Sequence, residues 1–160
     1  MNASMFVLGV IARDDHYLVV QERDGSWYLP AGKVEEGENL IAAMVRETVE
    51  EAGQLVGLRG LLAIDHGWRS GEPPTTRLRF VFAGYPAVQM APKDFADEHS
   101  LGAAWLPKQD IARLQLRDAE VVRWIDAWEA AAGTVLPCGA YDWYGPEGSA
   151  RAFSGRSGRM

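Results

Sequence analysis

The sequence predicts one α/β domain in which a mixed β-sheet lies between helices. Several short apolar and β-branched runs, separated by turn residues, have the pattern of strands. Two longer segments, 39–52 and 118–132, repeat their apolar residues at helical spacing. A chain of 160 residues can bury one core well but is short for two. Strands around a central helix and a closing helix therefore indicate a sheet between helical layers.

The N-terminal part of the chain has the pattern of three strands, expected at 5–12, 17–21 and 27–30. A turn signal at 13–15 separates the first two, so they are expected to form a hairpin. No basic region precedes the first apolar run and no small-residue cleavage site follows it. We therefore interpret this run as a strand rather than a signal peptide.

A glycine- and glutamate-rich loop over 31–38 leads into a helix expected over 39–52. Gly53 follows in the position of a C-terminal cap. Five apolar residues lie on one arc at helical spacing and form the expected buried face: Ile41, Met44, Val45, Val49 and Ala52. Later strands are expected at 55–58, 61–66, 77–82 and 104–106.

The domain is expected to span residues 1–133, ending after the closing helix. A C-terminal extension, 134–160, follows it. This extension carries a small aromatic cluster, Tyr141, Trp143 and Tyr144, and ends in a Gly/Ser/Arg tail. We expect the cluster to pack partly against the domain and the tail to lie on the surface.

The formal net charge of −6 gives the protein no general attraction to nucleic acid or to an anionic membrane. No apolar run approaches membrane-spanning length. The one cysteine, Cys138, excludes an intrachain disulfide and a Cys/His zinc site, and a free buried thiol is expected. These features favour a cytoplasmic protein that binds neither nucleic acid nor membrane. They leave a homodimer open.

Three carboxylates, Glu47, Glu50 and Glu51, lie at i, i+3 and i+4 of the expected helix and share an arc of about 100°. Like charges at these spacings repel by roughly 0.2–0.5 kcal/mol a pair, and Arg46 offsets only part of this. A bound hard cation would explain the cluster. Oxygen ligands that must also meet phosphate favour Mg²⁺, with Mn²⁺ as second choice. A solvated acidic surface is the alternative.

The segment from Gly32 to Gly53, GKVEEGENLIAAMVRETVEEAG, resembles the Nudix box. The residues at its seven fixed positions are Gly32, Glu38, Arg46, Glu47, Glu50, Glu51 and Gly53. A chance match in a chain of this size has a probability on the order of 10⁻⁶. Thr48 and Gln54 depart from the pattern, because the family prefers aliphatic residues at these two packing positions. The resemblance implies a Nudix-type α/β/α sandwich.

The resemblance also implies roles for single residues. The implied metal ligands are the Ala31 carbonyl, Glu47, Glu50 and Glu51. Glu38 would help to hold the metal shell, and Arg46 would orient Glu47 by an ion pair. Such a site suits attack by water on phosphorus, because metal ions neutralise phosphate oxygens and lower the pKa of bound water. The general base would be a box glutamate or an acidic residue on a later loop, where position favours Glu98 over Asp97.

Residues outside the box would select the substrate. Trp68 and Arg69, in a loop expected over 67–76, could stack on a base and contact a phosphate. Tyr28 precedes the catalytic loop and could line the same cleft. Arg79 shares a strand face with Arg77 and would bind phosphate only if that face looks into the cleft. A structural role is the alternative for each of them.

The function indicated is Mg²⁺-dependent hydrolysis of the pyrophosphate linkage of a small phosphorylated substrate. By resemblance to the MutT-like members, that substrate is a nucleoside di- or triphosphate or a related nucleoside diphosphate derivative. Two alternatives stay open: a non-catalytic module that senses a nucleotide, and a hydrolase of a non-nucleotide diphosphate. Sensor modules usually lose box glutamates, and all are present here, which favours the enzyme.

Overall fold

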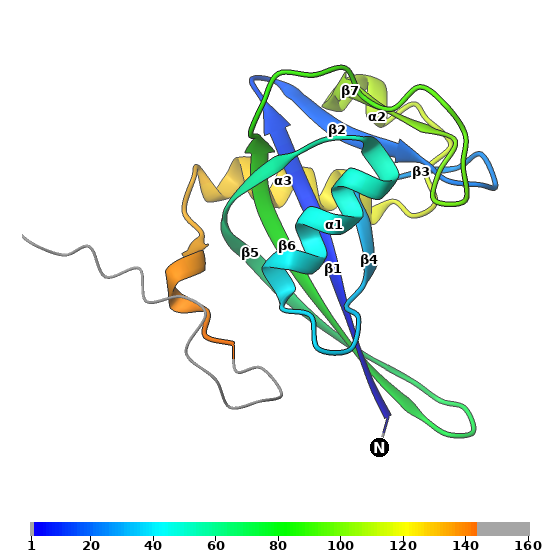
Figure 1. Ribbon diagram of the computed structural model, residues 1–160, viewed down its shortest axis with the longest axis vertical. Coiled ribbons are helices and arrows are strands. Elements are labelled where there is room, and N and C mark those ends of the chain that lie inside the picture. Colours follow the sequence, from blue (N-terminus) through cyan, green and yellow to red (C-terminus); the bar gives the residue numbers. More distant parts are fainter. Residues whose placement is uncertain (1, 144–160) are drawn as a thin grey trace, which may run out of the picture.

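The computed structural model describes residues 2–143 as a sheet of eight strands flanked by helices (Figure 1). The elements in chain order are β1 (Asn2–Arg13), β2 (His16–Gln21), β3 (Trp27–Tyr28), β4 (Ala31–Lys33), α1 (Leu40–Ala52), β5 (Val56–Arg69), β6 (Thr75–Pro86), β7 (Gly102–Pro107), α2 (Lys108–Ile111), α3 (Glu120–Ala131), β8 (Leu136–Pro137) and the 3-10 turn η1 (Cys138–Ala140). The expected hairpin of the first two strands is present, because β1 and β2 pair antiparallel.

Strand β1 organises the sheet and makes it mixed. It runs parallel to β6, with Asn2 opposite Thr75 and Ile11 opposite Gly84. It runs antiparallel to β4 and to β2, which pair with different parts of its length. Beyond β6 the sheet continues through β5 to β8. The expected α/β class with a mixed sheet is confirmed.

Helices α1 and α3 cover opposite faces of this sheet (Figure 1). Successive side chains of a strand point to opposite faces. Val7 of β1 therefore packs with Met44 of α1, whereas Leu8 packs with Ile125 of α3. All four side chains are essentially inaccessible to solvent. The layer order predicted from the sequence, helix, sheet, helix, is confirmed.

Helix α1 begins and ends where expected, but its buried face is rotated from the predicted arc. The Asn39 side chain accepts a hydrogen bond from the Ala42 N–H, and Gly53 closes the helix in the left-handed conformation, φ 62°. Thr48 is fully buried, whereas Val49, placed on the predicted arc, is 46% exposed. The Thr48 hydroxyl donates to the Met44 carbonyl at 2.8 Å, which satisfies it inside the core.

The two strands expected at 55–58 and 61–66 form one long strand, β5. Its pairing with β6 shifts register at two places, between Leu58 and Gly60 and between Leu61 and Ala63, so the chain bulges there without breaking. The strand also extends further than expected. Trp68 and Arg69 pair with β6 instead of lying in a loop, and only the turn between β5 and β6 is irregular.

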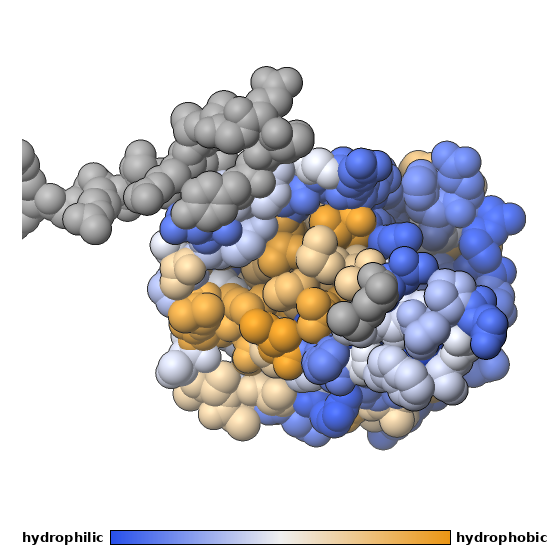
Figure 2. Space-filling model, turned by 90° about the horizontal axis from the view of Figure 1, so that it is seen from below, coloured by the Kyte–Doolittle hydropathy of each residue, from blue (hydrophilic) through white to orange (hydrophobic). Residues whose placement is uncertain are grey.

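The described residues after 133 pack against the sheet and against α1. Strand β8 pairs with β5, and the Tyr141 hydroxyl accepts a hydrogen bond from the Leu40 N–H at 3.2 Å. A cavity of about 480 Å³ with mainly apolar walls lies between this segment and the sheet, and hydrophobic side chains gather there (Figure 2). Cys138 is free but only half-buried, which corrects the expected buried thiol.

Tyr144 and the Gly/Ser/Arg tail lie outside the described residues, so the boundary at residue 133 stays a prediction. Among residues 2–143, no helix combines the length and the hydrophobicity needed to span a lipid bilayer.

Candidate functional site

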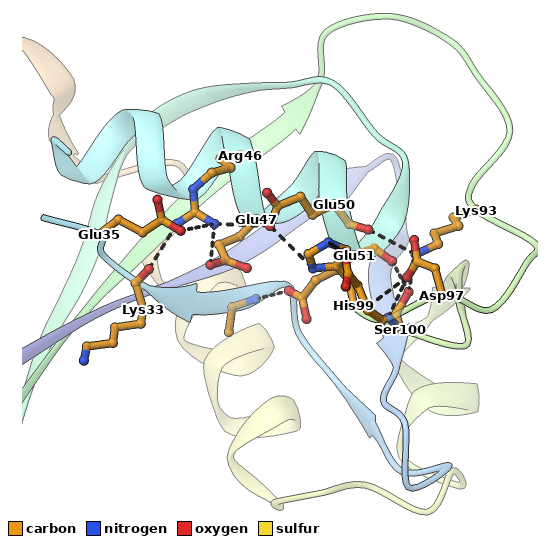
Figure 3. Close-up of polar contacts among 12 residues, drawn as sticks. Lys33, Glu35, Arg46, Glu47, Glu50, Glu51, Lys93, Asp97, His99 and Ser100 are labelled. Atoms are coloured by element: carbon orange, nitrogen blue, oxygen red, sulfur yellow. Dashed lines mark hydrogen bonds and ion pairs between the residues drawn. The ribbon is translucent and has the colours of Figure 1, made fainter. Parts of the chain in front are cut away.

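The guanidinium of Arg46 gathers the carboxylates of α1 and of the loop before it. It forms a two-pronged contact with Glu38, Nε to Oε1 at 2.8 Å and Nη2 to Oε2 at 3.0 Å. Its Nη1 donates to Glu47 at 2.8 Å and to Glu50 at 3.2 Å, and its Nη2 also donates to the Lys33 carbonyl. The expected Arg46–Glu47 ion pair is therefore present, and the same cation fixes the loop over the helix (Figure 3).

Glycine at position 32 makes room for the Glu47 carboxylate. A Cβ atom added at Gly32 would lie 1.9 Å from the Glu47 carboxyl carbon. Gly32 belongs to β4 and pairs with Val7 of β1, so its backbone cannot move aside freely. The glycine is required here by close approach, because its backbone angle is not unusual.

The Glu51 carboxylate turns toward the same strand. Its Oε1 accepts a hydrogen bond from the Ala31 N–H at 2.9 Å. Burial raises the pKa of Glu51 to about 8, partly opposed by that hydrogen bond. Burial also raises the pKa of Glu47, although Arg46 opposes this. Two neighbouring carboxylates thus lie where a negative charge is unfavourable unless a cation accompanies it.

Two polar side chains that the sequence did not single out, Lys93 and Ser100, brace the last turn of α1 (Figure 3). The Ser100 hydroxyl donates to the Glu51 carbonyl at 2.6 Å, and the Lys93 ammonium donates to the Glu50 carbonyl at 3.1 Å. Lys93 also donates to the Ser100 hydroxyl at 3.0 Å. Both side chains are buried. They hold the backbone of the two residues that carry the end of the acidic cluster.

The loop over 97–100 lies beside this cluster and carries Asp97, Glu98 and His99. Asp97 is occupied structurally: it pairs with Lys93 at 2.5 Å and accepts from the His99 and Ser100 N–H groups, and the Lys93 contact is the main reason that its pKa falls to about 2. Glu98 instead points into solvent, 86% exposed. His99 lies between Glu98 and Glu50, 3.4 Å from the one and 3.6 Å from the other.

The donor set of the cluster suits a hard cation. Its side chains offer carboxylate oxygens, and backbone carbonyls are close by, which are the ligands of Mg²⁺ and Mn²⁺. Within the described residues, no three acidic, histidine or cysteine side chains yet converge on one point. Glu47 and Glu50 turn to Arg46, and Glu51 turns to the Ala31 N–H. Rotation of these side chains would be needed to enclose an ion.

A cavity of about 400 Å³ lies on the α3 face of the sheet and collects the expected substrate residues. Its walls include all four of them and six others: Tyr28, Asp65, Gly67, Trp68, Arg69, Arg77, Arg79, Arg117, Asp118 and Glu120. We call it the mixed-charge pocket. Arg117 lines this pocket, and its positive charge slightly opposes the rise in the pKa of Glu51 that burial causes. The Arg117 guanidinium stacks over the Tyr28 ring at 4.9 Å.

The Arg79 guanidinium is already fully engaged by the protein. It donates to Glu120 at 2.6 and 2.8 Å and to Asp65 at 2.7 Å. The Tyr28 hydroxyl also bonds Glu120 and accepts from Arg79. Burial alone would raise the pKa of Glu120, but the bonds from Arg79 and Tyr28 outweigh it and lower the pKa to about 2. Arg79 and Tyr28 therefore form a rigid wall rather than free ligands.

The structure thus brings the expected residues together in two groups. Glu38, Arg46 and Glu47 share direct contacts, Glu50 joins them through Arg46, and Glu51 reaches Ala31. The expected substrate residues line the separate cavity, although the Trp68 residue is 66% exposed. Glu98 touches neither group directly and connects only through His99.

A family model and several known proteins match most of this chain. The NUDIX domain family model matches residues 3–125. The 8-oxo-dGDP phosphatase NUDT18 is 40% identical over 114 residues in Mus musculus and 37% identical over 117 residues in Homo sapiens. These matches cover 67% and 69% of this chain but 33% and 34% of those proteins, so the chain spans about a third of their length. A NUDIX hydrolase structure from Nitrosomonas europaea is 32% identical, with a TM-score of 0.74, over 89% of this chain and 98% of its own.

Proposed function

The chain belongs to the Nudix family, and we propose that it is a metal-dependent hydrolase that cleaves the pyrophosphate linkage of a nucleoside diphosphate. One observation carries this proposal. The carboxylates of Glu47 and Glu51 both lie against β4, one beside Gly32 and the other 2.9 Å from the Ala31 N–H, where burial raises the pKa of each. A divalent cation would stabilise their charged forms, and a diphosphate needs such a cation to neutralise its oxygens.

The residues present fit Mg²⁺, with Mn²⁺ as the second choice. The proposed ligands are the Ala31 carbonyl, Glu47, Glu50 and Glu51. All are hard oxygen donors, and the described neighbourhood offers no thiolate that would favour a softer metal. The space that Gly32 leaves for Glu47 serves this fit, because it lets a carboxylate approach the β4 backbone closely.

The bound cation would polarise the phosphate oxygens and lower the pKa of the attacking water. Side chains around the cluster would hold the loop and the helix in place. Glu47 and Glu50 would turn from Arg46 to hold the ion, while the two-pronged contact between Arg46 and Glu38 would keep the loop before α1 attached to the helix. The Lys93 and Ser100 contacts keep the end of α1 from moving as the side chains rotate.

We propose Glu98 as the group that accepts the proton of the attacking water. Its carboxylate is exposed and contacts only His99 among the described residues, whereas Asp97 already accepts hydrogen bonds within its own loop. His99 pairs with Glu98 and lies 3.6 Å from Glu50, so the loop carries Glu98 close to the proposed metal ligands. Glu98→Gln should then reduce kcat with little change in KM for the substrate or in melting temperature, whereas Asp97→Asn should lower the melting temperature.

The mixed-charge pocket is the proposed site of the nucleoside. Trp68 offers an exposed aromatic face at the rim, and Arg69 adds a cation that can meet a polar edge or a phosphate, whereas Tyr28 is buried in the wall beneath Arg117. Arg79 is assigned to the wall, because its donors are taken by Asp65 and Glu120. The curated relatives are named for 8-oxo-dGDP, so an oxidised guanine nucleotide is the first candidate.

Hydrolysis of a nucleotide panel tests the proposal. Nucleoside di- and triphosphates with normal and oxidised bases are incubated with Mg²⁺, and the products are separated by chromatography. We expect a diphosphate to give the monophosphate and inorganic phosphate. Glu50→Gln should lose at least about a hundredfold in rate, because it removes a charged ligand. Glu36→Gln is the matched control, since this box-loop glutamate is exposed and outside the cluster.

The same panel separates the alternatives. Tight binding of a nucleotide with no turnover in either wild type or Glu50→Gln would favour a nucleotide sensor. Turnover of a non-nucleotide diphosphate alone would place the substrate outside the nucleotides. We further propose the cytoplasm as location, since the one cysteine is unpaired. The homodimer stays a prediction, which analytical ultracentrifugation would test.

A further inference from the structure

A third cavity shares three residues with the mixed-charge pocket, and the described residues of its walls include no acidic side chain. Its volume is about 320 Å³, several times the roughly 30 Å³ that a water molecule occupies in the liquid. Its lining combines three guanidinium groups, two hydroxyls and one aromatic ring: Ser4, Phe6, Arg69, Thr75, Arg77 and Arg117. We call it the arginine pocket. A concentration of positive charge is notable in a chain of net charge −6.

Strand register explains how these residues meet. Ser4 of β1 is opposite Arg77 of β6, and Thr75 of β6 is opposite Arg69 of β5. Residues directly opposite one another lie on the same face of a sheet. Phe6 precedes Leu8 by two positions and therefore shares its face, the one that α3 covers further along. The arginine pocket is thus the polar continuation of the core under α3.

The charges in this pocket are not all balanced by the protein. Arg117 pairs with Glu22 at 2.8 Å. Among residues 2–143, by contrast, neither Arg69 nor Arg77 forms an ion pair. The Arg77 guanidinium stacks over the Phe6 ring at 4.8 Å, and its Nε is buried without a hydrogen-bond partner in that part of the chain. The guanidinium groups of Arg77 and Arg69 thus have no acceptor among the described residues, and an anion in the pocket would supply one.

An anion held by Arg77 would lie too far from β4 to be the diphosphate that is cleaved. Ala31 is opposite Leu8 of β1, and Arg77 is opposite Ser4 of the same strand. Strand geometry then separates Ala31 from Arg77 by two strand spacings, roughly 10 Å, and by four residues along the strand, roughly 13 Å. Their Cα atoms are therefore about 16 Å apart, which exceeds the reach of an arginine side chain.

We propose that the arginine pocket binds a second phosphate group of the substrate, carried on the sugar of a nucleoside diphosphate. The proposal rests on the proposed function for the position of the cleaved diphosphate. Arg117 lines both this pocket and the mixed-charge pocket, which is the proposed site of the nucleoside. A nucleoside would then span from the metal ligands at β4 to Arg77. Free inorganic phosphate shares this chemistry and is the other source that the test must separate.

Calorimetric titration with two ligands that have no anhydride bond tests the proposal. Guanosine 5′-monophosphate and guanosine 3′,5′-bisphosphate are compared in Mg²⁺, with inorganic phosphate as a third ligand. The bisphosphate should bind at least about tenfold more tightly than the monophosphate, because one charge-assisted hydrogen bond contributes enough free energy for this factor. Arg77→Gln and, separately, Arg69→Gln should each reduce that ratio toward one.

Arg59→Gln is the matched control, because Arg59 is another sheet arginine stacked on an aromatic ring, Tyr85, outside the pocket. Arg69 is exposed, so its variant should fold even if loss of Arg77 unfolds the protein. Equal affinities of wild type for the two guanosine ligands would overturn the proposal. So would inorganic phosphate binding that depends on Arg77 without any advantage for the bisphosphate. Absence of hydrolysis would count against the proposed function alone, since this readout is binding.

Discussion

The Ser100 hydroxyl donates a 2.6 Å hydrogen bond to the backbone carbonyl of Glu51, across 49 positions in the sequence. The last carbonyls of a helix have no partner within the helix. Here a buried serine and a buried lysine, Lys93, take two of them at the residues that carry the acidic cluster. The position of the proposed metal ligands therefore depends on a loop that lies far away in the chain.

Ser100→Ala should weaken the binding of Mg²⁺ in a protein that still folds. Loss of the hydroxyl leaves the Glu51 carbonyl and part of the Lys93 ammonium unpaired, which costs about 1–3 kcal/mol of stability. The Mg²⁺ concentration for half-maximal activity should rise several-fold, while kcat at saturating Mg²⁺ changes little. Ser70→Ala, in the exposed β5–β6 turn, is the control. A lower melting temperature with an unchanged Mg²⁺ requirement would show a structural role only.

Glu51→Gln should stabilise the metal-free protein at high pH. Burial raises the pKa of Glu51 from 4.5 to about 8, so the folded state holds a proton that the unfolded state loses. The contribution of Glu51 to the free energy of unfolding is fully present below pH 4.5 and is lost as the pH rises to about 8. A glutamine carbonyl can still accept the Ala31 N–H without this loss.

Thermal melts at pH 6 and pH 8, with a chelator and with millimolar Mg²⁺, check this prediction. With chelator, the variant should melt above wild type at pH 8, and the difference should shrink at pH 6. With Mg²⁺ the order should reverse at pH 8, because only wild type gains stability from the ion by mass action. Parallel pH profiles for the two proteins in chelator would contradict a raised Glu51 pKa.

Gly32→Ala should displace Glu47 without unfolding the sheet. The added methyl would overlap the Glu47 carboxyl group, 1.9 Å from its carbon, and the flexible end of the side chain can swing away. Activity should fall by at least about tenfold through the lost ligand, with a small change in melting temperature. Gly139→Ala is the control, because nothing lies within 4 Å of its added Cβ. Full activity of Gly32→Ala would argue against Glu47 as a ligand.

Glu120→Gln should destabilise the protein and loosen the side chains of Tyr28 and Arg79. It removes the charged acceptor of Arg79 and of the Tyr28 hydroxyl, which costs roughly 1–3 kcal/mol. Asp126→Asn on the same helix breaks only an exposed pair with Lys108, which is worth about 0.2–1 kcal/mol. Urea unfolding should separate the two variants. Equal midpoints would show that Glu120 contributes no more than a surface charge.

Local chemistry explains which parts of the site the sequence predicted well. The start and end of α1 follow from Asn39 and Gly53, which act within one helical turn. The contact between Arg46 and Glu47 likewise joins neighbours in the sequence. The buried face of the helix was predicted less well. Thr48 packs inward although it is polar and Val49 points outward, because the sheet beneath the helix decides which residues are covered.

The sequence by itself determined the order of the elements, the Nudix family and the group of carboxylates on one helix, because strand and helix periods and short-range spacing suffice for these. The tertiary structure decided what each charge faces. Arg79 is neutralised because Asp65 and Glu120 approach it from two other elements, whereas Arg77, one strand period away, has no ion-pair partner among residues 2–143. Ion pairs between distant segments depend on packing, which no local pattern encodes.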